Sequence, residues 1–425
     1  MTFSFIPRHE PAISRYAPCA TRFALYALLI FTPLARGSVQ GWAVTIIQMV
    51  TLLALTAFLI EKSLTGTWKW IKTPLDLPLL ILLILVILSV VFSVHRQTSL
   101  WATVMLVTYV VIFYLVINTF RTRAQLRQLV YLIIGVATFL AIFGLFKRFG
   151  VNPFPFWDYG DLKYIPDHLS STYGNYNHLA GYMEMALPLI LGLFLVGYKR
   201  GKLFTLCYLT LLILTALILT LSRGGWIGSL MGLTFMAIVL LTNRYFTGKK
   251  LIATLAGGFL VVAVVVLAST PVVERIRTLD QKTETPSFRA RVTVWGGVAE
   301  MIKDHPLLGA GPGTFATVFT QYQPPGQGAR YFMAHNDYLH FISEVGLPLV
   351  AVIIWMIIAL YRKGFKKMLN PSRLVRGITI GAMSGITALL VHSISDFNLH
   401  IPANALLFTV LAALIAAPLP IDNGK

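Results

Sequence analysis

The chain has 425 residues, of which 56% are hydrophobic and only 12% charged, and its mean hydropathy is +0.74. A soluble domain carries roughly 25% charged residues, so the composition excludes an ordinary soluble protein and indicates an all-α polytopic membrane protein. The net charge of +19 is explained by basic loops between membrane spans, and we expect no nucleic acid among the partners. Two cysteines, Cys19 and Cys207, predict neither a disulfide framework nor a thiolate metal site.

Twelve apolar runs predict transmembrane helices in one membrane domain over residues 1–425. Continuous apolar runs indicate helices, because a transmembrane barrel would alternate polar and apolar residues. The first 22 residues carry three arginines and lack an apolar signal core, so we expect no cleavable signal peptide. The runs are about 23–36, 41–60, 77–93, 102–119, 128–146, 178–198, 203–222, 226–242, 251–268, 338–360, 377–394 and 403–418.

The distribution of positive charge predicts the orientation of these spans. If the N-terminus is cytoplasmic, most of the 35 basic residues fall in cytoplasmic loops, as the positive-inside rule requires. Both termini are then cytoplasmic, and the informative polar segments face outward, which in a bacterial inner membrane means the periplasm. These segments are a large loop over 269–337 between the ninth and tenth runs, a smaller loop over 149–177, the junction 221–225 and the turn 396–402.

The large loop holds a cluster of arginines followed by a histidine. Guanidinium groups bind phosphate or carboxylate by paired hydrogen bonds, and histidine moves protons near neutral pH. The loop therefore predicts an anionic substrate and an acid–base step. Because soluble nucleotide donors are absent outside the inner membrane, a phosphate site there favours a lipid-linked substrate. The residues are Arg275, Arg277, Arg289, Arg291, Arg330 and His335.

Within this loop, residues 288–302 predict an amphipathic helix. We expect it to lie along the membrane surface with Trp295 in the interface and to end at Asp304, before a flexible glycine-rich return over 309–313. His335 precedes the next apolar run, where the positive end of a helix lowers a histidine pKa and favours a neutral base. The apolar stripe of the helix is Val292, Trp295, Val298, Ala299 and Ile302.

The order and spacing of several short motifs resemble the O-antigen ligase and polymerase superfamily of bacterial envelopes. The resemblance covers roughly residues 170–425, and the first five runs are similar in hydropathy alone. The motifs are Arg291 four residues before Trp295, the run from Pro306 to Phe315, His335 and Asn336 with Leu339, Glu344 two before Gly346, Tyr173 to Asn177, and Ser222 to Gly225.

The resemblance implies a multispanning (GT-C-like) glycosyltransferase that takes a glycan from undecaprenyl diphosphate at the periplasmic face. The acceptor is a hydroxyl of lipid A core in ligases, and a second lipid-linked glycan in polymerases; we favour the ligase. It also implies an inverting reaction with no metal and no cofactor, in which arginines neutralise the departing diphosphate. The roles carried over are His335 as catalytic base; Arg223, Arg291 and Arg289 for the diphosphate; and Asn336, Tyr338, Asn175, Asn177 and Arg330 for sugar or acceptor.

Each of these residues has a structural alternative. His335 could only cap a helix, Arg223 could reach toward lipid headgroups, and the asparagines could cap helix starts. Arg289 and Arg291 are two apart and diverge by about 200° on a helix, so we expect only one of them to face the site. Glu344 follows His340 by four residues, a spacing that also fits a structural pair.

Two other classes of function remain as alternatives. A transporter of lipid-linked sugars should show related halves with broken helices near the midplane, and no such internal repeat is visible in the sequence. A purely structural role as a partner of other membrane proteins would not explain the arginine cluster.

The orientation can be tested by cysteine labelling. In a Cys-free variant, a single cysteine at Gly328 should react with an impermeant maleimide from the periplasm, because it lies in the large loop. A cysteine at Lys366 should react only after permeabilisation. The reverse pattern would place the arginine cluster in the cytoplasm.

Overall fold

The computed structural model describes residues 12–68, 71–157, 168–243, 246, 286–323 and 330–421, and the predicted run at 251–268 lies outside them. Within these ranges the regular structure is helical apart from one isolated β-bridge, between Thr122 and Ile421. Seven of the described helices are long and apolar enough to cross a membrane, and three shorter apolar helices accompany them. The expected polytopic membrane protein is confirmed, and the full number of spans stays a prediction.

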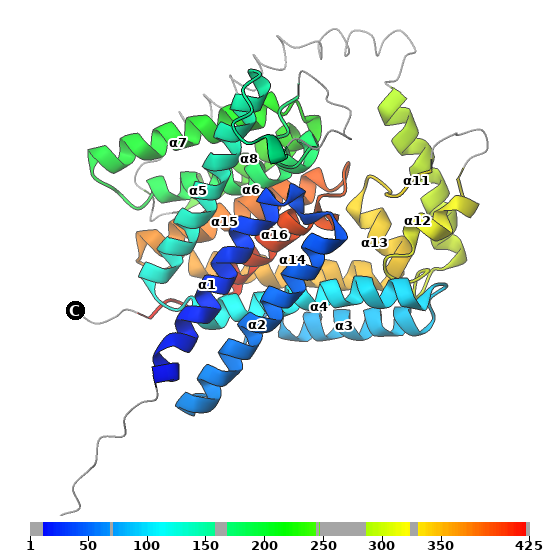
Figure 1. The fold of residues 1–425 in the computed structure, drawn as a ribbon, viewed down its shortest axis with the longest axis horizontal. Helices are drawn as coiled ribbons and strands as arrows, with labels where there is room; N and C mark the ends of the chain where they lie inside the picture. Colours follow the sequence, from blue (N-terminus) through cyan, green and yellow to red (C-terminus); the bar gives the residue numbers. More distant parts are fainter. Residues whose placement is uncertain are drawn as a thin grey trace, which may run out of the picture.

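The N-terminal third forms two helical hairpins and one long helix (Figure 1). Helices α1 and α2 run side by side, α3 and α4 form the second pair, and α5 begins at a capping box made by Thr122 and Gln125. The bounds are α1 Ala12–Leu34, η1 Arg36–Ser38, α2 Gly41–Thr65, α3 Asp76–Val91, α4 Arg96–Thr119, α5 Arg123–Arg148 and η2 Pro155–Trp157.

Three helices in the middle of the chain follow, α6 Tyr176–Phe194, α7 Arg200–Leu219 and α8 Arg223–Thr242. Helix α6 is not among the seven candidate spans, because its first half carries polar side chains that include His178 and Glu184. It is nevertheless buried almost all around. A polar helix start enclosed by other helices is where a membrane enzyme can hold charged groups away from lipid.

The C-terminal helices fill the centre of the bundle: α14 Pro348–Lys367, α15 Arg373–His392, η5 Asn398–His400 and α16 Pro402–Ala416. Helix α15 contacts α5, α6, α8, α14 and α16 (Figure 1). Its glycines 377, 381 and 385 repeat every fourth residue and face α6, and a Cβ at any of them would collide with the α6 backbone. Small residues at this spacing let two membrane helices pack backbone to backbone.

Helix α8 packs closely on α15 in the same way, and it also contacts α6. A Cβ at Gly228 or Gly232 would meet the backbone carbonyls of Ala388 or Ser384, and one at Gly224 would meet the ring of His392. Helices α6, α8 and α15 therefore pack closely on one another, and the N-terminal ends of α6 and α8 lie beside the C-terminal end of α15.

Outside the bundle, α11 Pro286–Asp304, α12 Phe315–Val318, η4 Phe319–Gln321 and α13 Asp337–Val345 share a small core of their own. Helix α11 ends at Asp304 as predicted. Its buried side is formed by Val294, Val298 and Met301, in the core shared with α12, η4 and α13. Its position along the membrane surface stays a prediction. Val292 and Ala299, which we expected in the apolar stripe, are exposed.

Two further expectations about this region are corrected. The run at 338–360 is two helices, α13 and α14, separated at Gly346, whose φ is 95°. The return over 309–313 is a fixed loop, since the N–H of Ala310 donates to Ser343 O at 3.0 Å and that of Gly311 to Glu344 O at 2.9 Å. A Cβ at Gly309 would collide with the backbone of Glu344, so this loop is clamped against α13.

The α6–α15 contact gives a stability prediction. Gly377→Ala should destabilise the protein by about 1–3 kcal/mol, because the added methyl has no room beside the Gly192 carbonyl and the helices must separate. The readout is the thermal unfolding midpoint in detergent. Gly135→Ala on α5 is the matched control, since a Cβ there meets nothing within 4 Å. Equal midpoints for the two variants would contradict the close packing.

Candidate active site

His335 occupies a strained turn where the outer helices meet the bundle. Its φ is 51°, a left-handed conformation that a residue with a side chain rarely adopts. The next residue, Asn336, is the N-cap of α13, and its Oδ1 accepts the Leu339 N–H at 3.0 Å. A rare conformation just before a well-capped helix indicates a side chain held in place by its surroundings.

The ring of Phe397, which follows α15, lies between two histidines. The His335 ring packs edge-on against it with centroids 5.1 Å apart, and the His178 ring from α6 does the same at 4.8 Å. The atoms His335 Nδ1 and His178 Nε2 are buried and find no hydrogen-bond partner among the described residues. Buried polar atoms usually have partners, so these two nitrogens are suited to a group that the protein does not itself supply.

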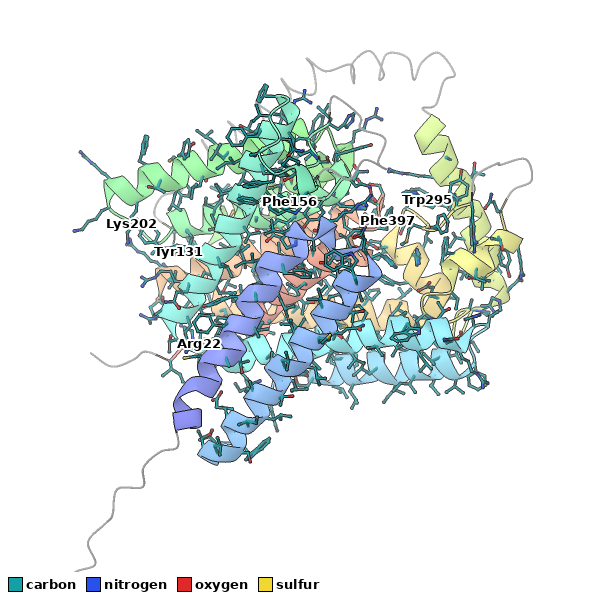
Figure 2. The ribbon with its side chains drawn as sticks, in the orientation of Figure 1. Arg22, Tyr131, Phe156, Lys202, Trp295 and Phe397 are labelled. Carbon is teal, nitrogen blue, oxygen red and sulfur yellow. The ribbon has the colours of Figure 1, made fainter. Side chains whose placement is uncertain are left out.

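An arginine from α11 reaches the same place. Arg291 Nη2 lies 3.8 Å from Asp396 Oδ2, and Asp396 is almost fully buried. The other carboxylate oxygen, Oδ1, accepts the Phe397 N–H at 2.8 Å. Within the described part of the chain, this ion pair is the contact made by the Arg291 guanidinium, which leaves donors for an anion. Figure 2 labels Trp295 of α11 and Phe397 at this boundary between the outer helices and the bundle.

The surroundings keep His335 neutral at pH 7. Burial lowers the pKa of its imidazole below the ordinary value of 6.5, and the positive charge of Arg291 lowers it further. Asp396 opposes both effects without overcoming them. A neutral imidazole can accept a proton, so the geometry and the charge both suit a general base.

Arg223 is the first residue of α8, after the N-cap Ser222. The next residue, Gly224, packs against His392 and Ser395, so the first turn of α8 lies beside the segment that leads to Asp396. Arg223 is exposed there. The structure thus brings α8, α11 and the segment after α15 together at the His335 turn, although they are distant in sequence.

The other predicted site residues make contacts within the fold. Asn175 caps α6 by accepting the Asn177 N–H at 2.9 Å, and the Tyr338 hydroxyl donates to Leu390 O at 2.7 Å. The Arg330 guanidinium donates to Ala316 O at 2.8 Å. The side chain of Arg289, which lies in α11, falls outside the described residues, as do Arg275 and Arg277.

The sequence did not reveal the partner of Glu184. This carboxylate, fully buried in α6, lies 3.0 Å from Nδ1 of His392 at the end of α15. An acidic residue inside an apolar run signals a buried partner, but nothing in the sequence says which of nine histidines it is. The pair lies beneath the site, since the other side of the His392 ring faces Gly224.

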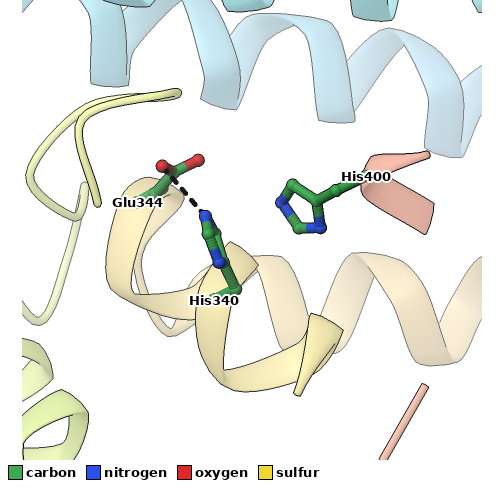
Figure 3. A group of neighbouring side chains, drawn as sticks. All are labelled: His340, Glu344 and His400. Atoms are coloured by element: carbon green, nitrogen blue, oxygen red, sulfur yellow. Dashed lines mark ion pairs between the residues drawn. The ribbon is translucent and has the colours of Figure 1, made fainter. Parts of the chain in front are cut away.

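Three side chains next to the site have the spacing of metal ligands. One ligand atom from each of His340, Glu344 and His400 lies within 4.8 Å of the others (Figure 3). His340 Nε2 is 3.3 Å from Glu344 Oε1. His400 Nδ1 is 2.6 Å from Asp337 Oδ1, and its Nε2 is buried without a partner in the described ranges.

The hydrogen bonds of His340 argue against a metal at this cluster. The Ala334 N–H points at His340 Nδ1 at 3.4 Å, so that nitrogen is the acceptor and the proton sits on Nε2, which donates to Glu344. A metal on Nε2 would move the proton to Nδ1, where it would face another donor. Glu344 Oε1 is also occupied by the Phe315 N–H at 3.0 Å. The set fits a hydrogen-bonded network.

A comparison with known protein families identifies the region that contains Arg223, Arg291 and His335. The family model described as O-Antigen ligase matches residues 208–354. These residues belong to the O-antigen ligase family. No curated protein matches the chain. The O-antigen ligase domain runs from α7 into α14 and includes the α11–α13 core. For this region of a multi-pass membrane protein, the match supports glycan transfer of the ligase or polymerase type.

The tautomer of His340 predicts that the protein gains no stability from zinc at this cluster. After treatment with a chelator, the thermal unfolding midpoint should be unchanged, and a slight excess of Zn²⁺ should not raise it. His400→Gln is the control variant. A midpoint that rises with zinc in the natural protein and not in His400→Gln would reveal a metal site there.

Proposed function

We propose that the protein is an inverting, metal-independent glycosyltransferase that transfers a glycan from undecaprenyl diphosphate to a hydroxyl of lipid A core. The observation that carries the proposal is a neutral, partly buried imidazole, His335, beside the arginine of the Arg291–Asp396 pair inside an O-antigen ligase domain. A base and a cation at one place are what glycosyl transfer from a diphosphate requires.

The membrane arrangement belongs to the same proposal. About twelve spans, residues 251–268 among them, form a single membrane domain with both termini cytoplasmic. Residues 269–337 and 149–177 then lie in the periplasm of a bacterial inner membrane, and the arrangement resembles integral-membrane (GT-C-like) glycosyltransferases. The positive-inside distribution of Lys and Arg supports this orientation.

The diphosphate of the donor is held by Arg291 and Arg223, with Arg289 as a third candidate. Arg291 has donors available beyond its ion pair at 3.8 Å, and Arg223 stands at the N-terminal end of α8, where the helix dipole also favours anions. Two planar guanidiniums can take the place of a divalent cation, because each binds phosphate oxygens by paired hydrogen bonds.

The acceptor hydroxyl attacks the anomeric carbon of the donor sugar. As the new C–O bond forms, the hydroxyl proton passes to the His335 imidazole, and the bond from the anomeric carbon to the diphosphate oxygen breaks with its electron pair on oxygen. The departing diphosphate is already a stable anion and needs charge neutralisation more than protonation. Attack from the opposite side inverts the anomeric centre.

Sugar and acceptor contacts are proposed for Asn336, Tyr338, Asn175, Asn177 and Arg330. Asn175 is the N-cap of α6, which carries His178, and Asn336 is the N-cap of α13, directly after His335. Their amides therefore lie at two helix starts near the site. Each amide keeps its NH₂ donors beyond the cap bond. Arg330 is exposed and can meet acceptor phosphates.

The proposal is tested by a transfer assay with purified protein, an undecaprenyl-diphosphate glycan and either lipid A core or a second lipid-linked glycan. We expect glycan on lipid A core. His335→Gln should lower the rate at least about 100-fold, because Gln keeps a hydrogen bond and cannot take the proton. Elongation of the second glycan alone would make the protein a polymerase, and near-normal transfer by His335→Gln would exclude His335 as the base.

The diphosphate contacts are tested by substitutions that keep the charge. Arg291→Lys and Arg223→Lys should each slow transfer about tenfold or more, since lysine lacks the planar pair of donors. Arg96→Lys is the control, an exposed arginine at the start of α4. Full activity in both site variants would show that positive charge alone is enough.

A further inference from the structure

The unusual backbone of His335 requires contacts on both sides of it. A left-handed residue with a side chain costs of order 1–3 kcal/mol and persists where the surroundings fix it. On the C-terminal side, the Asp337 N–H donates to Ser393 O at 2.9 Å and Asp396 O at 3.1 Å. The Asp337 carboxylate also accepts the Leu399 N–H at 3.0 Å. That side is fastened to the segment after α15.

On the N-terminal side, the fixed residue is Ala334, which is fully buried. Its N–H donates to His340 Nδ1 at 3.4 Å, and its C=O accepts the Trp295 Nε1–H at 3.0 Å. Both partners are side chains. His340 therefore orients the peptide unit before Ala334, and Trp295 orients the peptide unit that leads from Ala334 into His335. Both side chains can be changed without changing a residue of the turn.

His340 is itself held in one orientation (Figure 3). Its Nε2 is directed at Glu344 Oε1 at 3.3 Å, and its ring stacks on Phe315 with centroids 4.4 Å apart. The His400 ring closes the other side at 4.1 Å. Because Nε2 carries the proton toward Glu344, Nδ1 is left as an acceptor facing the Ala334 N–H.

We propose that His340 is a positioning residue for His335, acting through the bond between its Nδ1 and the Ala334 N–H. This inference rests on the proposed function of His335 as the base. Glu344 holds the His340 ring, and His340 and Trp295 hold the N–H and the C=O of Ala334. The backbone of Ala334, fixed on both sides, sets the direction in which the His335 imidazole leaves the chain. The chain of contacts places the base relative to Arg291 without touching a substrate.

Two substitutions of His340 separate its two nitrogens. In His340→Asn, the amide oxygen takes the place of Nδ1 and can still accept the Ala334 N–H, while the contact with Glu344 is lost. In His340→Gln, the amide takes the place of Nε2 and can still meet Glu344, while the Ala334 bond is lost. Both remove the ring between Phe315 and His400, so packing losses affect both.

The expected result is a kcat at least about tenfold lower for His340→Gln than for His340→Asn, with the same KM for the lipid-linked donor, because misplacing a base costs rate and leaves donor binding intact. Equal kcat values, or the opposite order, would overturn the proposal. Thermal unfolding midpoints measured on both variants show whether stability follows the same order, which a purely structural role would require.

Trp295→Phe supplies an independent measurement, since it removes the Nε1–H that binds Ala334 O and keeps an aromatic ring. Its kcat should also fall at constant donor KM, and an unchanged kcat would contradict the positioning of His335 through Ala334 even if the His340 variants fail to fold. His335→Gln in the same assay separates the two claims. If that variant transfers normally, the proposed base is wrong; if it is inactive while His340→Asn equals His340→Gln, this inference alone fails.

Discussion

The backbone contact of α15 with α6 and α8 is the constraint on which the rest of the structure depends. Because all three helices carry glycines at the contact, no side chains hold the backbones apart. In lipid there is little hydrophobic free energy to gain when apolar side chains of two helices meet, so close van der Waals packing drives their association. The contact fixes where α15 ends. The segment directly after His392, which includes Asp396 and Phe397, lies at the N-terminal ends of α6 and α8.

The site is completed where α11 and α13 pack against the segment that follows α15. Helix α11 brings Arg291 to Asp396, and α13 begins with its first N–H bound to the same segment. The imidazole at the junction is neutral because it is buried near a cation. The proposed glycosyl transfer from a diphosphate needs a proton acceptor and positive charge, and this junction holds a neutral imidazole beside an arginine.

Hydropathy predicted most of this architecture, and motif spacing predicted the O-antigen ligase family that residues 208–354 match. Helices occupy the predicted apolar runs in the described residues, because a span in lipid must satisfy its backbone internally and therefore leaves a continuous apolar signal. Spacing alone could not say that α11 buries Val294 and Met301 in place of Val292, since a short helix with apolar residues on several sides fits more than one stripe.

Contacts between elements distant along the chain could not be predicted from the sequence, for a different reason. The pairs Glu184 with His392 and Arg291 with Asp396 join residues more than 100 positions apart along the chain, and a single sequence carries no record of such partners. The glycine-rich return looked flexible because glycine permits many conformations. In this loop the absence of a side chain allows the backbone of Gly309 to lie directly against the backbone of Glu344.

The break between α13 and α14 allows the two helices to change their relative orientation. Gly346 ends α13 with φ of 95°, and α13 is tied to α3 by the Ser89 hydroxyl, which donates to Glu344 O at 3.0 Å. A membrane helix meets a thicker or thinner bilayer by changing its tilt. In an unbroken helix, a change of tilt would displace His335. Because the helix is interrupted at Gly346, α14 can change its tilt while His335 keeps its contacts with the surrounding helices.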